Sequence, residues 1–281
     1  MSQGFKLYHL LHSTHGTLES SNPLFMLMEF NAVYVIVARE FKKFVRERSR
    51  LFSAIARPLL WLFIVGAGMS RLVPRDTGVP YTQFIFPGII GMTILFSSMF
   101  SSISIIWDKE FGFMKEILVA PVSRLSIVVG KALSGTIVST IQALIILAFF
   151  PVIGFKLGFL QIIAVTFICA SVSFCISAFG IVLASFYESY ESFSVIMNFI
   201  IMPMFFLSGA MYPVKFLPAV LRLVAKLNPL TYGIDVMKHA IFPHETGSMG
   251  PDFSIMTSVL VIILASAAFV LIAGKAFERK G

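Results

Sequence analysis

Charged residues are scarce in this sequence. Asp, Glu, Lys and Arg make up 13% of its 281 residues, whereas hydrophobic residues make up 57% and the mean hydropathy is +0.90. A soluble domain is about 45–50% apolar and about 25% charged. The composition therefore excludes an ordinary soluble protein and predicts an integral membrane protein.

The sequence also lacks the motifs of common catalytic sites. Gly-Lys occurs at 130–131 and 274–275, but neither pair has the upstream glycine or the following Ser or Thr of a phosphate-binding loop. The signatures H-E-x-x-H, G-x-S-x-G and C-x-x-C do not occur either. We therefore expect no catalytic residue, no cofactor in this chain and no enzymatic activity.

Cysteine and histidine are few, and their placement argues against a metal site. Cys169 and Cys175 both fall in a predicted membrane span, where buried thiols are usually inert. His9, His12 and His15 could share one helical face and bind a metal, but no carboxylate or cysteine stands beside them. A flexible, polar cytoplasmic tail over residues 1–28 is the favoured interpretation.

Six apolar stretches are long enough to cross a bilayer, whose hydrocarbon core of about 30 Å needs roughly 20 helical residues. Because the first begins after residue 50, we expect it to act as its own targeting signal, without a cleaved signal peptide. The predicted fold is an all-α membrane protein with six transmembrane helices. They lie near 51–70, 83–107, 132–153, 158–186, 192–212 and 254–275.

Lys and Arg are distributed unevenly across these spans. Fifteen of the 22 fall on the side of the N-terminus and seven on the other side. Because basic residues favour the cytoplasmic side, both termini and the segment between the second and third spans are predicted to be cytoplasmic. This bias and anionic lipid account for the net charge of +8, so no nucleic-acid partner is expected.

Ionisable residues are absent from the centre of every predicted span. Arg57 stands near the start of the first span, where its long side chain can reach the interface. Proton-coupled transporters usually carry an intramembrane carboxylate or histidine. The absence argues against an ion-coupled secondary transporter, although a uniporter or channel would not need such a residue.

Residues 29–50 show a basic amphipathic pattern. Val33, Ile36 and Val37, followed by Phe41, Phe44 and Val45, share one face. A helix of this kind lies at the membrane interface with its cations toward lipid headgroups and water. The pattern predicts an interfacial helix that leads into the first span. Its cations are Arg39, Lys42, Lys43, Arg46 and Arg48.

The segment between the second and third spans, residues 106–124, is rich in charge for this chain, yet it carries an apolar stripe at helical spacing. A charged loop needs no such stripe, whereas a helix at the membrane surface or in a groove of another protein does. The ionisable residues are Asp108, Lys109, Glu110, Lys115, Glu116 and Arg124. The stripe consists of Phe111, Met114, Ile117 and Leu118.

After Leu207 the fifth span gives way to two short helical stretches. Ser208-Gly209 interrupts the helix, and Asn228-Pro229 interrupts the chain again. Residues 214–227 are basic and amphipathic but too short to cross the membrane. On the outer side they predict a re-entrant or surface-lying hairpin, whose irregular backbone must be satisfied by protein or water.

Two long stretches resemble one family. They read WDKEFGFMKEILVAPVSRLSIVVGKAL and, later, FLSGAMYPVKFLPAVLRLVAKLNPLTYGIDVMKHAIF. From about residue 30 to its C-terminus the chain resembles the ABC-2 type permeases, the membrane subunits of type-2 ABC exporters. The resemblance is closest to the drug-resistance and nodulation-factor exporter branch. One departure is Lys238, a headgroup-level position at which we expect Arg in many relatives.

The resemblance implies a transmembrane domain over residues 29–281 that pairs with a second permease copy in the bacterial plasma membrane, usually as a homodimer. Two copies of a separate cytoplasmic ATPase would bind ATP and Mg. Residues 29–50 would match the family's connecting helix and 213–242 its short exit-side helices. Residues 108–124, with the charged and stripe residues named above, would match its coupling helix, which docks on the ATPase. The residues expected at the exit-side gate are Ser208, Gly209, Pro213, Pro218, Asn228, Pro229 and Tyr232.

An ATP-driven exporter of amphiphilic or lipid-like substrates is the leading hypothesis. Apolar spans with 30 Phe and 14 Met suit such a cargo, but lipid-facing helices need the same composition. The alternatives are an ATP-independent secondary transporter or channel, and a membrane-embedded enzyme or assembly scaffold. Drugs, polyketides, glycolipids and polysaccharide precursors all stay open as substrates.

Overall fold

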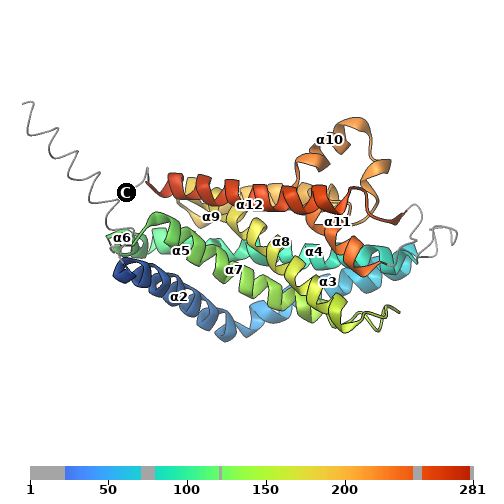
Figure 1. Cartoon of the computed structure of the whole chain (residues 1–281), viewed down its shortest axis with the longest axis horizontal. Coiled ribbons are helices and arrows are strands. Elements are labelled where there is room, and N and C mark those ends of the chain that lie inside the picture. The colour runs from blue at the N-terminus through green and yellow to red at the C-terminus, as the bar shows by residue number, and fades with distance from the viewer. Residues whose placement is uncertain (1–22, 71–79, 120–121, 243–248, 279–281) are drawn as a thin grey trace, which may run out of the picture.

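The computed structural model describes residues 23–70, 80–119, 122–242 and 249–278. Every regular element in these ranges is a helix, as the apolar runs predict (Figure 1). In chain order the elements are α2 (Pro23–Arg46), α3 (Arg48–Met69), α4 (Tyr81–Ser101), α5 (Ile103–Glu110), α6 (Phe113–Val119), α7 (Arg124–Leu147), α8 (Phe159–Phe186), α9 (Tyr190–Phe206), the short 3-10 helix η2 (Val214–Phe216), α10 (Ala219–Leu227), α11 (Pro229–Ile241) and α12 (Ile255–Glu278).

Among the described residues, four helical stretches are both long and apolar enough to cross a bilayer. They are α4 with α5, α7, α8 and α12. The apolar part of α3 (Ile55–Met69) and α9 (Tyr190–Phe206) are shorter. The 17 residues of α9 span about 26 Å at 1.5 Å per residue, less than a hydrocarbon core of about 30 Å. The six-span count therefore stays a prediction.

Three predicted span boundaries differ from the helix ends, one of them the end of the third span, predicted at residue 153 where α7 ends at Leu147. The third span was predicted to begin at residue 132, but α7 begins at Arg124. Its N-cap is Ser123, whose hydroxyl accepts a hydrogen bond from the Ser126 amide at 3.1 Å. The fifth span was predicted to reach residue 212, but α9 ends at Phe206. Hydropathy therefore located these elements better than it located their ends.

The N-terminal boundaries also differ from the prediction. The polar tail was expected over residues 1–28, but α2 already begins at Pro23. The basic helix expected over 29–50 is divided, since α2 ends at Arg46 and α3 begins at Arg48. Residues 1–22, which include His9, His12 and His15, lie outside the described part of the chain.

The core lies between α4, α7, α8 and α11, where the largest fully buried side chains include Phe84 and Phe86. Close approach depends on small residues. A β-carbon at Gly88 would come within 2.7 Å of the Ala210 backbone, so the turn after α9 lies directly on α4. This contact fixes the segment after the fifth apolar helix against the bundle.

The helix ends gather in two groups (Figure 1). The C-terminal end of α12 lies at the same end of the bundle as α6 and the start of α7, since a β-carbon at Gly274 would come within 2.7 Å of the Leu125 side chain. Near the other end, the Tyr81 hydroxyl donates to the Met211 carbonyl at 3.1 Å. Thus α6, the start of α7 and the end of α12 lie at one end, and the predicted exit-side segments lie toward the other.

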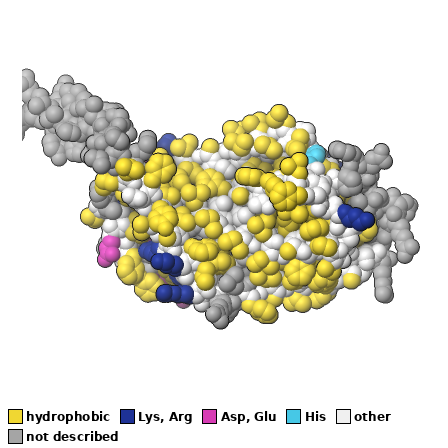
Figure 2. Space-filling model, turned by 60° about the horizontal axis from the view of Figure 1, so that its bottom comes forward, with side chains coloured by type: hydrophobic (Ala, Val, Ile, Leu, Met, Phe, Trp, Pro, Cys, Tyr) yellow, Lys and Arg dark blue, Asp and Glu magenta, His cyan; other side chains and the backbone are white. Residues whose placement is uncertain are grey.

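The outer surface of the helices is apolar. Figure 2 shows hydrophobic side chains over most of one face, with the few charged side chains mainly near its two ends. Phe167, Phe199, Ile263 and Leu264 are large, apolar and exposed. A soluble monomer rarely exposes apolar patches of this extent, whereas helices facing lipid require them.

Candidate functional site

The first feature of the site is the way α2 packs against α7. Near its start, the Glu29 carboxylate accepts hydrogen bonds from the Ser123 amide and hydroxyl, at 2.7 and 3.0 Å. Further along, Ile36 packs on Gly130, where a β-carbon would come within 3.2 Å of its side chain. The two helices therefore run in the same direction for several turns. Ile36 of the predicted apolar face of α2 is directed at α7, whereas Phe41 of the same face is 38% exposed.

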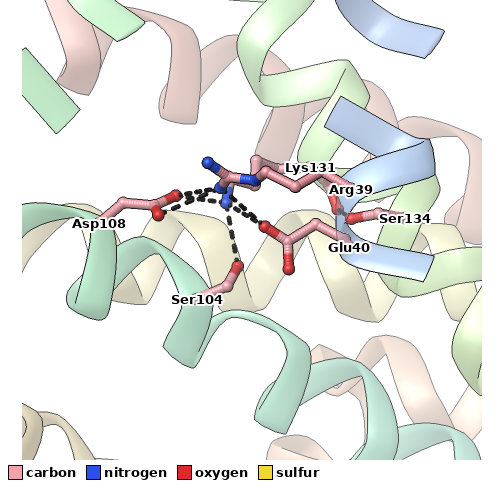
Figure 3. Close-up of polar contacts among 6 residues, drawn as sticks. All are labelled: Arg39, Glu40, Ser104, Asp108, Lys131 and Ser134. Atoms are coloured by element: carbon pink, nitrogen blue, oxygen red, sulfur yellow. Dashed lines mark hydrogen bonds and ion pairs between the residues drawn. The ribbon is translucent and has the colours of Figure 1, made fainter. Parts of the chain in front are cut away.

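Four charged side chains meet where α2, α5 and α7 come together (Figure 3). The Lys131 ammonium donates to Asp108 at 2.6 Å and to Glu40 at 2.8 Å. Arg39 donates to Glu40 at 3.0 Å and to the two oxygens of Asp108 at 2.9 and 3.1 Å. Ser104 accepts a further hydrogen bond from Lys131 at 3.2 Å. We call Arg39, Glu40, Asp108 and Lys131 the ion cluster.

The ion cluster is balanced in charge, because each of its two cations contacts both of its carboxylates. Burial alone would raise the pKa of Glu40, but Lys131 and Arg39 outweigh it and hold that pKa below its usual value. Burial would likewise lower the pKa of Arg39, but Glu40 and Asp108 raise it above its usual value. Arg39 and Glu40 are thus stabilised in their charged forms.

Burial makes the cluster sensitive to the loss of any member. The Lys131 side chain is 3% exposed, and those of Glu40 and Asp108 are each 11% exposed. A buried ion pair contributes little net stability, because desolvation offsets the attraction, but removing one partner costs about 3–5 kcal/mol. The cluster therefore holds α2, α5 and α7 in one arrangement.

A second anchor follows directly in sequence. The Lys109 ammonium donates to the Ala184, Ser185 and Tyr187 carbonyls at 2.7, 3.1 and 2.9 Å. These carbonyls lie at the C-terminal end of α8. The helix dipole favours a cation there, and the ammonium donates to carbonyls that have no partner within the helix. Asp108 and Lys109 were expected to face an outside partner. Instead, both point into the protein and fix α5 to its neighbours.

The predicted coupling helix over 108–124 is interrupted. α5 ends at Glu110, the chain turns at Gly112 with a φ of 81°, and α6 covers Phe113–Val119. The interruption divides the predicted apolar stripe. Met114 is buried, whereas Phe111 is 70% exposed. Glycine suits this turn because positive φ costs it little.

Among the described side chains of the predicted stripe, Phe111 alone is exposed, and the other exposed apolar side chains near this turn lie outside the stripe. Phe111, Phe113 and Val119 are all exposed, Val119 to 85%, and we call them the α5–α6 tip. The acidic residues Glu110 and Glu116 are exposed beside them, while Ile117 is partly buried. The side chains of Lys115 and Leu118 lie outside the described residues.

The predicted basic face of α2 is shared between protein and surroundings. Arg39 belongs to the ion cluster, and the Lys43 ammonium lies 4.0 Å from the Trp107 ring centroid. Lys42 and Arg46 are exposed. The side chain of Arg48 is not described, and Arg124, also predicted in the coupling segment, is partly buried at the start of α7.

A separate polar network organises the predicted exit side. Lys238, which was predicted at headgroup level, is 1% exposed and is therefore enclosed by protein. Its ammonium donates to the Gly209 carbonyl at 2.9 Å and lies 4.5 Å from the Phe84 ring centroid. The Asp252 carboxylate stands 3.9 Å away. Lys238 thus joins α11 to the turn after α9.

Two carboxylates complete this network. Asp235 accepts from the amides of Asp252 and Phe253 at 2.6 and 3.2 Å and from the Ser258 hydroxyl at 2.8 Å. Asp252 accepts from the amides of Val214 and Lys215 at 3.0 and 3.1 Å. The turn before α12 is thereby tied to η2 and to α11. The irregular backbone here donates hydrogen bonds from its amides to carboxylates of the protein.

The residues predicted for the exit-side gate lie around this network. Asn228 caps α11 by accepting from the Leu230 amide at 3.0 Å, and its own amide donates to the Met204 carbonyl at 2.7 Å. The Tyr232 hydroxyl donates to the Lys226 carbonyl at 2.8 Å. Ser208 is buried and Gly209 has a φ of 76°. Pro213, Pro218 and Pro229 mark the starts of η2, α10 and α11.

Sequence patterns did not predict several of these residues. Glu40 and Lys131 in the ion cluster, and Asp235 and Asp252 in the exit-side network, were not among the predicted site residues. One signal was present, since Glu40 is an acidic residue inside a basic stretch. No group of three or more metal-binding side chains occurs in the part of the chain that the structure describes.

A helical bundle with an apolar exterior and polar networks toward its two ends defines a multi-pass membrane protein. Residues 31–242 match the family model described as "ABC-2 type transporter". The chain belongs to the ABC-2 type transporter family, which confirms the resemblance predicted from the sequence.

Named relatives agree with this assignment. The chain is 33% identical to "Putative transport permease ycf38" of Cyanophora paradoxa, over 86% of this chain and 84% of the relative. It is 28% identical to "Nodulation protein J" of Rhizobium leguminosarum bv. trifolii, over 69% and 74%. It is 26% identical to "Inner membrane transport permease YadH" of Escherichia coli (strain K12), over 88% and 95%.

Proposed function

We propose that this chain is the membrane-spanning permease subunit of an ATP-driven exporter. It moves an amphiphilic or lipid-like substrate out of the cytoplasm or the inner leaflet. A separate ATPase subunit binds ATP and Mg, and this chain is not itself an enzyme. Family membership and relatives named as transport permeases support the transport role. The observation that carries the proposal is the α5–α6 tip. Its apolar side chains are exposed, and the helix that precedes it, α5, is held in place by buried ion pairs.

Coupling between two subunits requires a contact whose free energy differs between their states. The ATPase seats the α5–α6 tip in a groove, and its closure moves the tip. Asp108 and Lys109 directly precede the tip and link it to α2, α7 and the end of α8. A displacement of the tip is therefore passed to three helices at once.

The assembly follows from the same assignment. Two permease copies form a homodimer, each docked on one ATPase, in the bacterial plasma membrane. Both termini lie in the cytoplasm, and residues 208–232 form the exit-side gate. The excess of Lys and Arg on the side of the N-terminus supports this orientation. The gathering of α6, the start of α7 and the end of α12 at one end supports it too.

The test replaces the apolar side chains of the tip with carboxylates. In Phe111→Asp and Val119→Asp, a charge must be buried on docking, so co-purification of the ATPase falls by at least about tenfold. Transport by reconstituted vesicles falls with it. The matched control is Val220→Asp, because Val220 is 74% exposed in a helix of the predicted exit side. Val220→Asp is expected to retain both ATPase co-purification and transport.

Two results would contradict the proposal. One is normal ATPase binding and transport in both tip variants. The other is substrate movement by wild-type vesicles that contain neither ATPase nor ATP, which would establish the ATP-independent transporter instead.

A further inference from the structure

A cavity of about 370 Å³ lies between α3, α4, α7 and α9. Its lining is mainly apolar and aromatic, with Met92, Phe96 and Phe100 from α4 and Trp107 from α5. The volume falls within the range of about 300–1,000 Å³ that is usual for small-molecule sites. The cavity is separate from the α5–α6 tip and from the exit-side network.

Two polar groups in this apolar lining have no partner. The amide oxygen of Gln142 and the hydroxyl of Ser97 are buried and form no hydrogen bond among the described residues. Gln142 is 2% exposed and Ser97 is 7% exposed, and both line the cavity. An unpaired buried polar atom is costly, so native proteins retain few of them. A ligand that hydrogen-bonds here removes that cost.

Opposite charges border the same cavity. Arg57 lies over the Phe96 ring, with 5.3 Å from guanidinium carbon to ring centroid, and Glu47 also lines the cavity. One cation and one anion give no overall preference for a charged ligand. The lining therefore favours a molecule that is apolar over most of its length and carries uncharged hydrogen-bonding groups.

We propose that this cavity binds the substrate, an amphiphile whose hydroxyl or amide N–H donates to the Gln142 amide oxygen. This inference rests on the proposed exporter function and names the chemistry of its substrate. Trp107 connects the cavity to the ion cluster, because it lines the cavity, precedes Asp108 and contacts Lys43. A bound substrate is thus in contact with the segment that transmits ATPase movement.

The experiment measures binding without ATP or ATPase, on the permease in phosphatidylcholine nanodiscs. One photoreactive probe is a monoacylglycerol with a diazirine in its chain, which carries hydroxyl donors. The second is the methyl ester of the same fatty acid, which carries none. Labelled peptides are identified by mass spectrometry. The glycerol probe is expected to label peptides of α4 and α9 that line the cavity, and the ester to label them more weakly.

The informative variant is Gln142→Leu, which keeps the size of the side chain and removes the acceptor. Loss of one hydrogen bond predicts that glycerol-probe labelling falls about fivefold, while ester labelling is unchanged. Ser97→Ala gives a smaller fall. The control is Ser173→Ala, because the Ser173 hydroxyl is also buried without a partner but does not line the cavity. It leaves labelling by both probes unchanged.

A melting measurement separates binding from folding. Since Gln142→Leu removes an unpaired polar group, it melts at or above the wild-type temperature while binding less probe. The proposal is overturned if the variant binds the glycerol probe as the wild type does, or if both probes label equally, as lipid filling the cavity would. Because no ATPase is present, either result leaves the tip-docking experiment unaffected.

Discussion

The sharpest prediction concerns Lys131→Met in the ion cluster. Methionine keeps most of the length and apolar stem of lysine but removes its charge. Lys131 donates to Asp108 and Glu40 at 2.6 and 2.8 Å. Without it, these two largely buried carboxylates share only Arg39, whose side chain is 47% exposed.

The expected magnitude follows from that geometry. Removing one partner from a buried, hydrogen-bonded charge pair costs about 3–5 kcal/mol. At roughly 2–4 °C for each kcal/mol in a protein of this size class, the melting temperature falls by roughly 10 °C. Lys42→Met on the exposed side of α2 is the matched control, with an expected change below about 0.5 kcal/mol.

The assay is thermal unfolding of the purified protein in detergent, followed by size-exclusion chromatography. The double variant Lys131→Met with Asp108→Asn leaves Arg39 and Glu40 as a balanced pair, so it is expected to melt above Lys131→Met alone. A melting temperature within about 2 °C of wild type for Lys131→Met, or strictly additive losses in the double variant, would refute the reasoning.

Two further predictions follow from α2 and from the turn at Gly112. The folded-state pKa of Glu40 is lowered, so its contribution to stability is present above the unfolded pKa of about 4.3 and is lost as the pH falls through the folded value. The melting temperature of Glu40→Gln is therefore expected to be less sensitive to acidification from pH 6 to pH 3.5 than that of wild type. Equal sensitivity would contradict this. Gly112→Ala strains a backbone with a φ of 81° and is expected to lower the free energy of unfolding by about 1–2 kcal/mol in chemical denaturation. The control Gly68→Ala adds a methyl group that meets open space inside α3 and does not lower it. Equal effects of the two substitutions would contradict the argument from backbone strain.

Much of the fold could be predicted because membrane insertion leaves a strong local signal. The predicted spans at 158–186 and 254–275 agree with α8 and α12 to within a few residues. The start of α7 was missed because its first turns contain Arg124, Ser126 and Lys131 among apolar residues, so hydropathy alone placed the boundary too late. The end of α9 was missed because apolar residues continue through a turn.

The candidate site was harder to predict than the fold. The pattern over 106–124 correctly indicated an exceptional segment, but it assigned Asp108 and Lys109 to an outside partner. The neighbouring sequence does not show whether a charged side chain points into the protein or outward. Only the meeting of Glu40, Asp108 and Lys131, far apart in sequence, shows that these charges neutralise one another inside the protein.

The sequence by itself determined that this chain lies in a membrane, which family it belongs to and which stretches are helical. Hydropathy and motif identity are local properties that can be read from the amino-acid sequence. Tertiary structure alone decided which charges are buried, which apolar side chains stay exposed at the α5–α6 tip and where Gln142 meets a cavity. These properties depend on distances between helices, and burial changes the cost of a charge or an unpaired amide by several kcal/mol.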